Sequence, residues 1–202
     1  GALAVAVTYD GGVVMASVRR AESLLVMNIG TRKVAHVTDS IAMLHSGLGA
    51  DSRVLARRAQ EWCLGYQLKF GSSAPIPLTT LVSELALVMQ EYTQMGGVRP
   101  FGVALLVAGV EAEDMANTGE SQSDGTEINV GRGRSRLYKL EPSGRYSAWK
   151  AAALGKGSAE AESILERECG DCLNRDRALK LALSVILRCA PTGTKPEAID
   201  LA

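Results

Sequence analysis

The sequence predicts an α/β (α+β) fold: a four-layer α/β/β/α sandwich, with two antiparallel sheets face to face and helices outside each. Three observations favour it. Strand-like alternation fills much of the first 45 residues, two helical segments follow, and strands and then two helices recur in the second half. A helix buries one stripe and a sheet has two faces, so stacking four layers covers each apolar surface.

The N-terminal part is typical of strands joined by short turns. Apolar residues alternate with small or polar ones, and Asp10-Gly11-Gly12 and Thr38-Asp39-Ser40 supply turn residues. The predicted strands cover residues 3–8, 13–18, 33–37 and 41–45. Short turns between successive strands indicate antiparallel pairing rather than βαβ units.

Two helical segments follow residues 46–49. In the first, Leu55, Ala59, Trp62 and Tyr66 share one stripe. In the second, apolar side chains recur at helical spacing: Leu78, Leu81, Val82, Leu85, Val88, Met89 and Tyr92. Glycines at 71, 96 and 97 are expected to end these helices.

The second half repeats this order without a recognisable domain boundary. Val103–Val110 is predicted as a buried strand, and residues 111–135 as a polar loop inserted in a single domain that spans residues 1–202. A hairpin is expected around residues 141–144. Two further helices are predicted, the first capped by Ser158, and a last strand is expected within residues 197–202.

Composition excludes several classes of protein. The 22 basic and 22 acidic side chains cancel, so there is no overall electrostatic signature of a protein that binds nucleic acid or a membrane surface. Four cysteines are too few and too scattered for a disulfide-stapled secreted scaffold. No secretory leader pattern opens the chain, and no apolar run reaches the roughly 20 residues of a membrane span. We expect a soluble, intracellular domain.

Several motifs could carry chemistry, and each has a simpler interpretation. Cys169-Gly-Asp-Cys172 has the spacing of a redox pair or half a zinc site, but it follows a predicted helix and lacks a second ligand pair. His36 and His45 lie in strand patterns without a serine-hydrolase elbow. Gly131–Arg136 lacks aromatic stacking partners, and Gly155–Ser158 lacks the upstream glycine of a phosphate loop. We interpret these motifs as structural or solvated features.

Several segments resemble α-type subunits of the 20S proteasome core particle. The matching segments are Gly1–Val7, Gly12–Ala16, Arg32–Val34, Ser46–Leu55, Gln90–Val103, Pro142–Ala151 and Leu154-Gly155. The stretch Tyr92–Gly102 is highly specific to α-type subunits. Within eukaryotic sets, Val88–Gln94 together with Ala148–Ala151 is most similar to the second α-type subunit.

The resemblance implies the N-terminal-nucleophile hydrolase fold, a sandwich of the same four layers, but no catalysis. Catalytic β-type chains of this family attack with an N-terminal Thr whose own amine accepts the proton. Here position 1 is Gly, the matching acidic position falls on Val18, and Lys33 alone matches the family's lysine. We therefore expect no catalytic residues and no enzyme activity.

The resemblance also implies a docking site. In α-type subunits the matching lysine lies in a pocket between neighbouring subunits and pairs with the C-terminal carboxylate of an activator's tail. Lys33, Gly47 and Leu48 are thereby implied as tail-binding residues, with no cofactor and no metal. The implied partners are other α-type subunits in a seven-membered ring, β-type subunits and regulatory particles, with no nucleic acid or membrane.

The implied function is that of a structural, outer-ring subunit of the proteasome core particle. It would form the gated access and the docking face for regulatory particles in ubiquitin-dependent protein degradation, in cytoplasm and nucleus. The gate segment that precedes this part of α-type chains is not present before Gly1. We also expect the Arg99–Gly102 turn to hold the helix layer and the following strand together.

Two alternatives stay open at this point. One is an N-terminal-nucleophile amide hydrolase that uses a residue other than Thr, against which Gly1 argues. The other is a free-standing ligand-binding sandwich, which would be a stable monomer.

Overall fold

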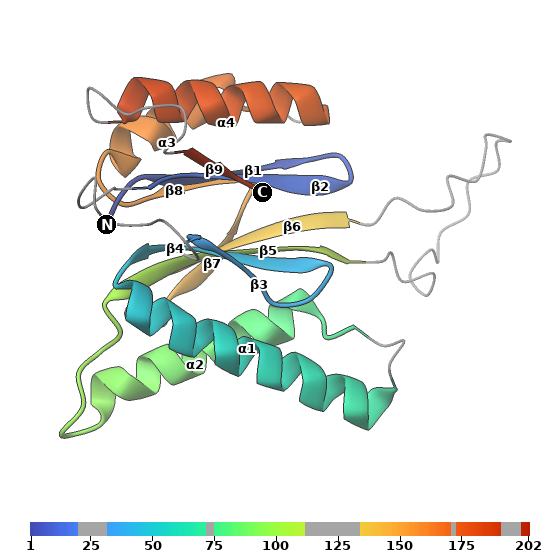
Figure 1. Ribbon diagram of the computed structural model, residues 1–202, viewed down its shortest axis with the longest axis vertical. Helices are drawn as coiled ribbons and strands as arrows, with labels where there is room; N and C mark the ends of the chain where they lie inside the picture. The colour runs from blue at the N-terminus through green and yellow to red at the C-terminus, as the bar shows by residue number, and fades with distance from the viewer. Residues whose placement is uncertain (20–31, 72–74, 112–133, 171–172, 191–198) are drawn as a thin grey trace, which may run out of the picture.

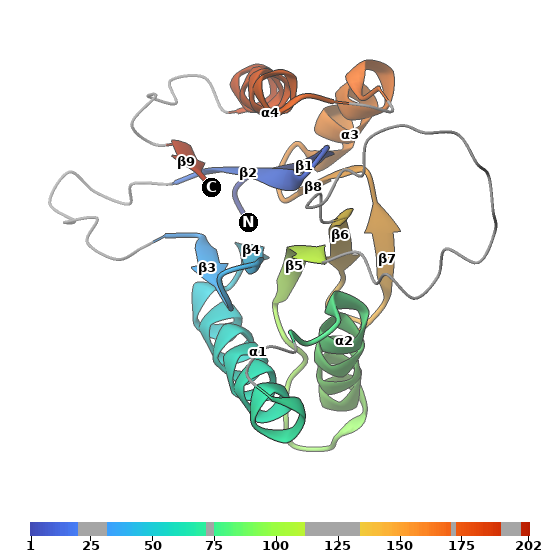
Figure 2. The same cartoon turned by 90° about the vertical axis from the view of Figure 1, so that its right-hand side faces the viewer.

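Two antiparallel sheets lie face to face, and a pair of helices covers the outer side of each (Figures 1 and 2). The computed structural model describes residues 1–19, 32–71, 75–111, 134–170, 173–190 and 199–202. The predicted α/β/β/α sandwich of two antiparallel sheets is confirmed. The helices are α1 (Gly49–Phe70), α2 (Leu78–Gln94), α3 (Ser158–Glu168) and α4 (Arg175–Cys189).

One sheet has the strand order β8-β1-β2-β9 among the described residues. Its strands are β1 (Ala4–Tyr9), β2 (Gly12–Val18), β8 (Ala151–Leu154) and β9 (Ile199–Leu201). The β1–β2 hairpin pairs Val7 with Val14, and Gly11 turns the chain at a φ of +94°, which a residue with a Cβ rarely adopts. Figure 1 shows α3 and α4 above this sheet.

The second sheet has the order β3-β4-β5-β6-β7. Its strands are β3 (Val34–His36), β4 (Ile41–Gly47), β5 (Val103–Glu111), β6 (Arg134–Leu140) and β7 (Tyr146–Trp149). The helices α1 and α2 pack on its outer face.

The strands expected in the N-terminal part all form, but the two hairpins belong to different sheets: β1–β2 to one, β3–β4 to the other. Alternation of apolar residues sets which face of a strand is buried and does not specify which sheet the strand joins. The chain crosses from one sheet to the other at a single residue, Lys150: β7, which precedes it, pairs with β6, and β8, which follows it, pairs with β1. The Lys150 carbonyl accepts hydrogen bonds from the Thr8 N–H (2.9 Å) and hydroxyl (2.7 Å), which fix this crossing.

The layer between the sheets is built from small and flexible aliphatic side chains. Its buried members are Ala4, Ala6, Met15, Val34, Leu44, Leu106, Ala108, Leu137, Ala152 and Leu154. Alanine lets the sheets approach closely, which explains why a core of this size needs so few aromatic residues. Two further clusters fill the helix–sheet layers, one under α1 and α2 and one under α3 and α4.

Some element ends differ from the sequence prediction. Ser158 is the first residue of α3, while the cap position is Gly157 with a φ of +85° and no side-chain cap bond. Glycine is favoured there because a Cβ would be strained by that backbone conformation. Helix α2 ends at Gln94, where Met95 is already extended, before the predicted glycines.

Parts of two predicted segments lie outside the described residues. Of the expected insertion at 111–135, residues 112–133 are not described, and of the last strand only Ile199–Leu201 is described. Across the described ranges, none of the helices is both long and apolar enough to cross a membrane.

Candidate functional site

The residues implied in tail binding come together where β4 leads into α1. Val34 pairs with Leu44 in the β3–β4 ladder, so Lys33 lies opposite His45, two residues before Gly47. Val34 and Leu44 both face the layer between the sheets. Because successive side chains alternate, Lys33 and His45 share the opposite face of the sheet, the face that α1 covers. The structure therefore gathers Lys33, Gly47 and Leu48 at one end of the sheet.

Gly47 is fixed by a close approach of backbone to backbone. Its φ is +127°, and a Cβ at this position would lie 2.3 Å from the Gly102 carbonyl oxygen. The same oxygen accepts a hydrogen bond from the Leu48 N–H at 2.9 Å. These constraints turn the chain out of β4 and leave the Leu48 side chain 51% exposed, directly before the first turn of α1.

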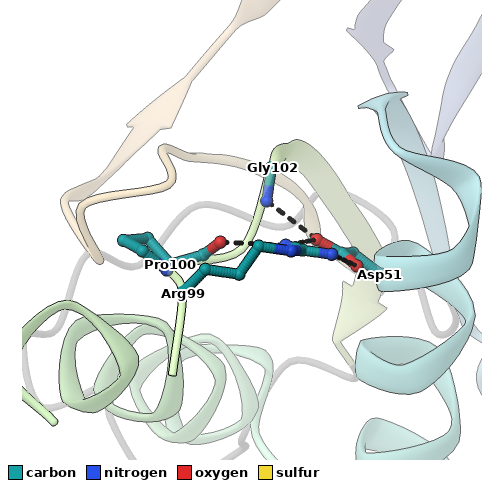
Figure 3. Close-up of polar contacts among 4 residues, drawn as sticks. All are labelled: Asp51, Arg99, Pro100 and Gly102. Atoms are coloured by element: carbon teal, nitrogen blue, oxygen red, sulfur yellow. Dashed lines mark hydrogen bonds and ion pairs between the residues drawn. The ribbon is translucent and has the colours of Figure 1, made fainter. Parts of the chain in front are cut away.

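A buried carboxylate holds this turn against the start of β5 (Figure 3). Asp51, in the first turn of α1, accepts hydrogen bonds from both terminal nitrogens of Arg99, at 2.7 and 2.8 Å. It also accepts one from the Gly102 N–H at 2.8 Å. The Arg99 side chain stays largely exposed, whereas the Asp51 side chain is 10% exposed. The turn thus ties the helix layer to the following strand, as expected for Arg99–Gly102.

These donors stabilise the charged form of the carboxyl group. The Arg99 hydrogen bonds, joined by the Gly102 N–H and the positive charge of the guanidinium, hold the pKa of Asp51 below its usual value, although burial opposes them. Beside this contact, Phe101 is buried, and its ring packs against Tyr92 of α2 with centroids 4.6 Å apart. The turn therefore links α1, α2 and β5.

The His45 side chain lies between Lys33, which directly precedes β3, and the start of α1. Its ring nitrogen Nδ1 lies 2.9 Å from the Lys33 carbonyl oxygen. Burial lowers the pKa of His45, the positive charges of Lys33 and Arg53 lower it further, and the hydrogen bond opposes this in part. A histidine whose pKa lies below its ordinary value near 6.5 is neutral at pH 7.

Gly1 is packed closely against the end of β4, with no space for a Cβ. A Cβ at Gly1 would lie 2.2 Å from Ser46 Oγ and 2.6 Å from the Gly47 nitrogen. Ser46 Oγ itself donates to the Ala2 carbonyl oxygen at 3.0 Å, so it is engaged in holding this segment. Val18, at the matching acidic position, is buried and apolar.

The remaining candidate motifs stay apart from this region. Cys169 lies at the end of α3 and Cys172 lies outside the described residues. Among the residues described, no cluster of three His, Cys, Asp or Glu side chains could hold a metal ion. Half of Gly131–Arg136, residues 131–133, is likewise not described; of its arginines, Arg136 pairs with Glu111 at 2.7 Å. Gly155 and Gly157 serve the tight turn from β8 into α3.

A groove of about 370 Å³ lies between the β3–β4 turn and α1, lined by residues such as Ser40, Gln60 and Leu64. Lys33, Gly47 and Leu48 are not among its lining residues.

Comparison with known proteins gives a consistent result. The family model described as "Proteasome subunit" matches residues 1–131 and 126–202. The chain is 36% identical over 183 residues to "Proteasome subunit alpha type-2-A" of Arabidopsis thaliana, covering 91% of the chain and 68% of the relative. It is 37% identical over all 202 residues to "Proteasome subunit alpha" of Thermococcus gammatolerans, again 68% of the relative. "Proteasome subunit alpha type-2" of Dictyostelium discoideum is 35% identical over 186 residues, which is 92% of the chain and 70% of the relative.

The fold is the four-layer sandwich of the N-terminal-nucleophile hydrolases. The chain belongs to the proteasome subunit family, and its relatives named above are all alpha subunits. The predicted α-type class and the predicted absence of enzyme activity are therefore confirmed, and similarity to type-2 alpha subunits is found as expected. It is a structural subunit that assembles with other proteasome subunits.

The close approach at Gly47 gives a first prediction. Gly47→Ala should lower the free energy of unfolding by about 1–3 kcal/mol or more, because the new Cβ meets a carbonyl oxygen in a strained backbone conformation. Gly65→Ala in the middle of α1, where a Cβ meets nothing within 4 Å, should instead stabilise by about 0.5–1 kcal/mol. Thermal unfolding of both variants checks this, and equal behaviour would contradict it.

The Asp51 contact gives a second prediction. Asp51→Asn should reduce the unfolding free energy at pH 7 by about 1–3 kcal/mol, because an amide cannot pair with the guanidinium. Arg99→Ala should cost at least as much, since it leaves the Asp51 carboxylate buried with the Gly102 bond but without the cation that compensates its charge. The Asp51 pKa is depressed when folded, so its contribution is present above its usual value of 3.8 and is lost as the pH falls below that value. Denaturant titrations from pH 7 to pH 3 should show wild type and Asp51→Asn converging.

Proposed function

We propose that this chain forms part of the outer α-type ring of the proteasome core particle and presents a docking face for regulatory particles. Membership of the family and relatives named as alpha subunits support the ring assignment. By the resemblance, the ring has seven members and stacks on a ring of β-type subunits that carry the threonine nucleophiles. Its work is to restrict access to the inner chamber, in the cytoplasm and the nucleus.

Lys33, Gly47 and Leu48 are the proposed tail-binding residues of this chain. The observation that carries the proposal is their convergence near the junction of β4 and α1, with Leu48 half exposed beside a glycine whose backbone conformation and close neighbours disfavour a side chain. An ammonium group and a terminal carboxylate form a charge-assisted hydrogen bond, and the exposed leucine offers an apolar contact for the tail's side chains. A neighbouring subunit would supply the other wall of the pocket.

The composition of the native complex tests the ring assignment. A tag on this chain should isolate a very large particle that contains several related chains, with threonine-type peptidase activity carried by other subunits. Native mass spectrometry and an activity assay measure both properties. A free monomer, or a particle containing this chain alone, would contradict the assignment and favour the ligand-binding sandwich.

Replacing the lysine tests the docking site. Lys33→Ala should reduce co-purification of regulatory particles severalfold, because the tail carboxylate loses its cation, while the mass and basal peptidase activity of the core stay unchanged. Lys69→Ala is a matched control, because it removes an exposed lysine at the opposite end of α1. If both variants retain regulatory particles equally, Lys33 is not a docking residue.

A further inference from the structure

The strand that leads from Lys33 is short and is fixed at both ends by side chains. Strand β3 comprises only Val34–His36, at the edge of its sheet, where it pairs with β4. At its far end, Gln60 Nε2 of α1 donates to the His36 carbonyl oxygen at 2.9 Å. At its near end, the ladder bond from the His45 N–H to the Lys33 carbonyl oxygen is long, at 3.4 Å. The shorter contact to that oxygen, at 2.9 Å, comes from the His45 ring.

The direction of this hydrogen bond fixes the state of the ring. A carbonyl oxygen only accepts, so Nδ1 carries the proton and donates it. The other nitrogen, Nε2, faces the start of α1, since a Cβ placed on Gly49 would lie 3.7 Å from it. One half-buried imidazole therefore sits between the end of β3 that carries Lys33 and the helix start that follows Gly47 and Leu48.

The charges around the His45 ring favour its neutral form. Lys33 and Arg53 both act on the imidazole, and their positive charges disfavour a third cation beside them. A neutral ring can donate to the Lys33 carbonyl without repelling the ammonium group. The neutral imidazole therefore adds no further positive charge beside the lysine.

We propose that His45 is a positioning residue of the tail-binding site, whose imidazole holds the Lys33 backbone in register with Gly47 and Leu48. This inference rests on the proposed function of Lys33. Without the ring bond, the Lys33 carbonyl oxygen would lose the shorter of the two hydrogen bonds that it accepts from His45. The lysine would then lose part of its preorganisation for a carboxylate, at a cost in affinity.

Three substitutions separate positioning from general stability. His45→Asn places an amide nitrogen close to where Nδ1 lies and retains the donor. His45→Gln places its amide nearer the position of Nε2 and loses that donor. Gln60→Ala removes a hydrogen bond of the same length from the other end of the same strand, so it reports on loosening of β3 as such. Native mass spectrometry verifies that each variant is incorporated into the particle.

The binding assay uses assembled particles and defined peptides. Fluorescent ten-residue peptides copied from the C-termini of the co-purifying regulatory subunits are titrated by anisotropy, and amidated versions serve as controls for the carboxylate. We expect His45→Gln to weaken carboxylate-dependent binding by about three- to tenfold, the effect of losing one hydrogen bond. His45→Asn should restore most of the affinity, and Gln60→Ala should bind like wild type.

Lys33→Ala in the same series distinguishes the two proposals. If it binds the peptides as tightly as wild type, or if wild type shows no carboxylate-dependent binding, the docking function itself fails, and the role of His45 with it. If Lys33→Ala loses binding while His45→Gln does not, the docking site stands and the positioning role is overturned. Equal losses in His45→Gln and Gln60→Ala, or in His45→Gln and His45→Asn, also overturn it.

Discussion

The Asp51 carboxylate is the contact on which this end of the molecule depends. Three donors converge on it from a turn roughly 50 residues away in the chain, two from Arg99 and one from the Gly102 N–H. A buried carboxylate with paired charges and satisfied oxygens costs little to keep buried, whereas an unpaired one would be strongly unfavourable. Its donors also hold Gly102, whose carbonyl oxygen binds Leu48 and excludes any side chain at Gly47. One ion pair thus sets the path of the chain between β4, α1 and β5.

This arrangement explains how a docking surface can be rigid without a deep cavity. The proposed tail-binding residues depend on backbone constraints: a glycine at positive φ, a helix start, and a strand end held by hydrogen bonds. A flexible tail loses conformational entropy when it binds, so a preorganised receptor limits the total cost of association. The exposed Leu48 follows a constrained glycine, and Lys33 lies opposite His45 in the β3–β4 register, so the proposed pocket would need little rearrangement to bind a tail.

Local patterns in the sequence predicted the helices and strands well, because periodicity reports which face of each element is buried. They could not assign strands to sheets, because both N-terminal hairpins show the same alternation of apolar residues. The change of sheet at Lys150 is likewise not marked by any turn residue in the sequence. The partner of Arg99 was also not predictable, since Asp51 reads as an ordinary acidic residue in the first turn of a helix. The implied docking residues came from resemblance, and only the structure shows His45 between them, because its contact depends on the β3–β4 register.

One fold can support different functions in related proteins, so function depends on the residues at particular sites. A Cβ on Gly1 would meet Ser46 Oγ and the Gly47 nitrogen, and the Ser46 hydroxyl donates to the Ala2 carbonyl oxygen. The first described residues are thus packed against the end of β4, directly beside the proposed docking residues. Packing at Gly1 therefore supports Gly47 from one side while the Asp51 contact supports it from the other. Contacts on both sides thus hold the turn on which the proposed docking residues lie.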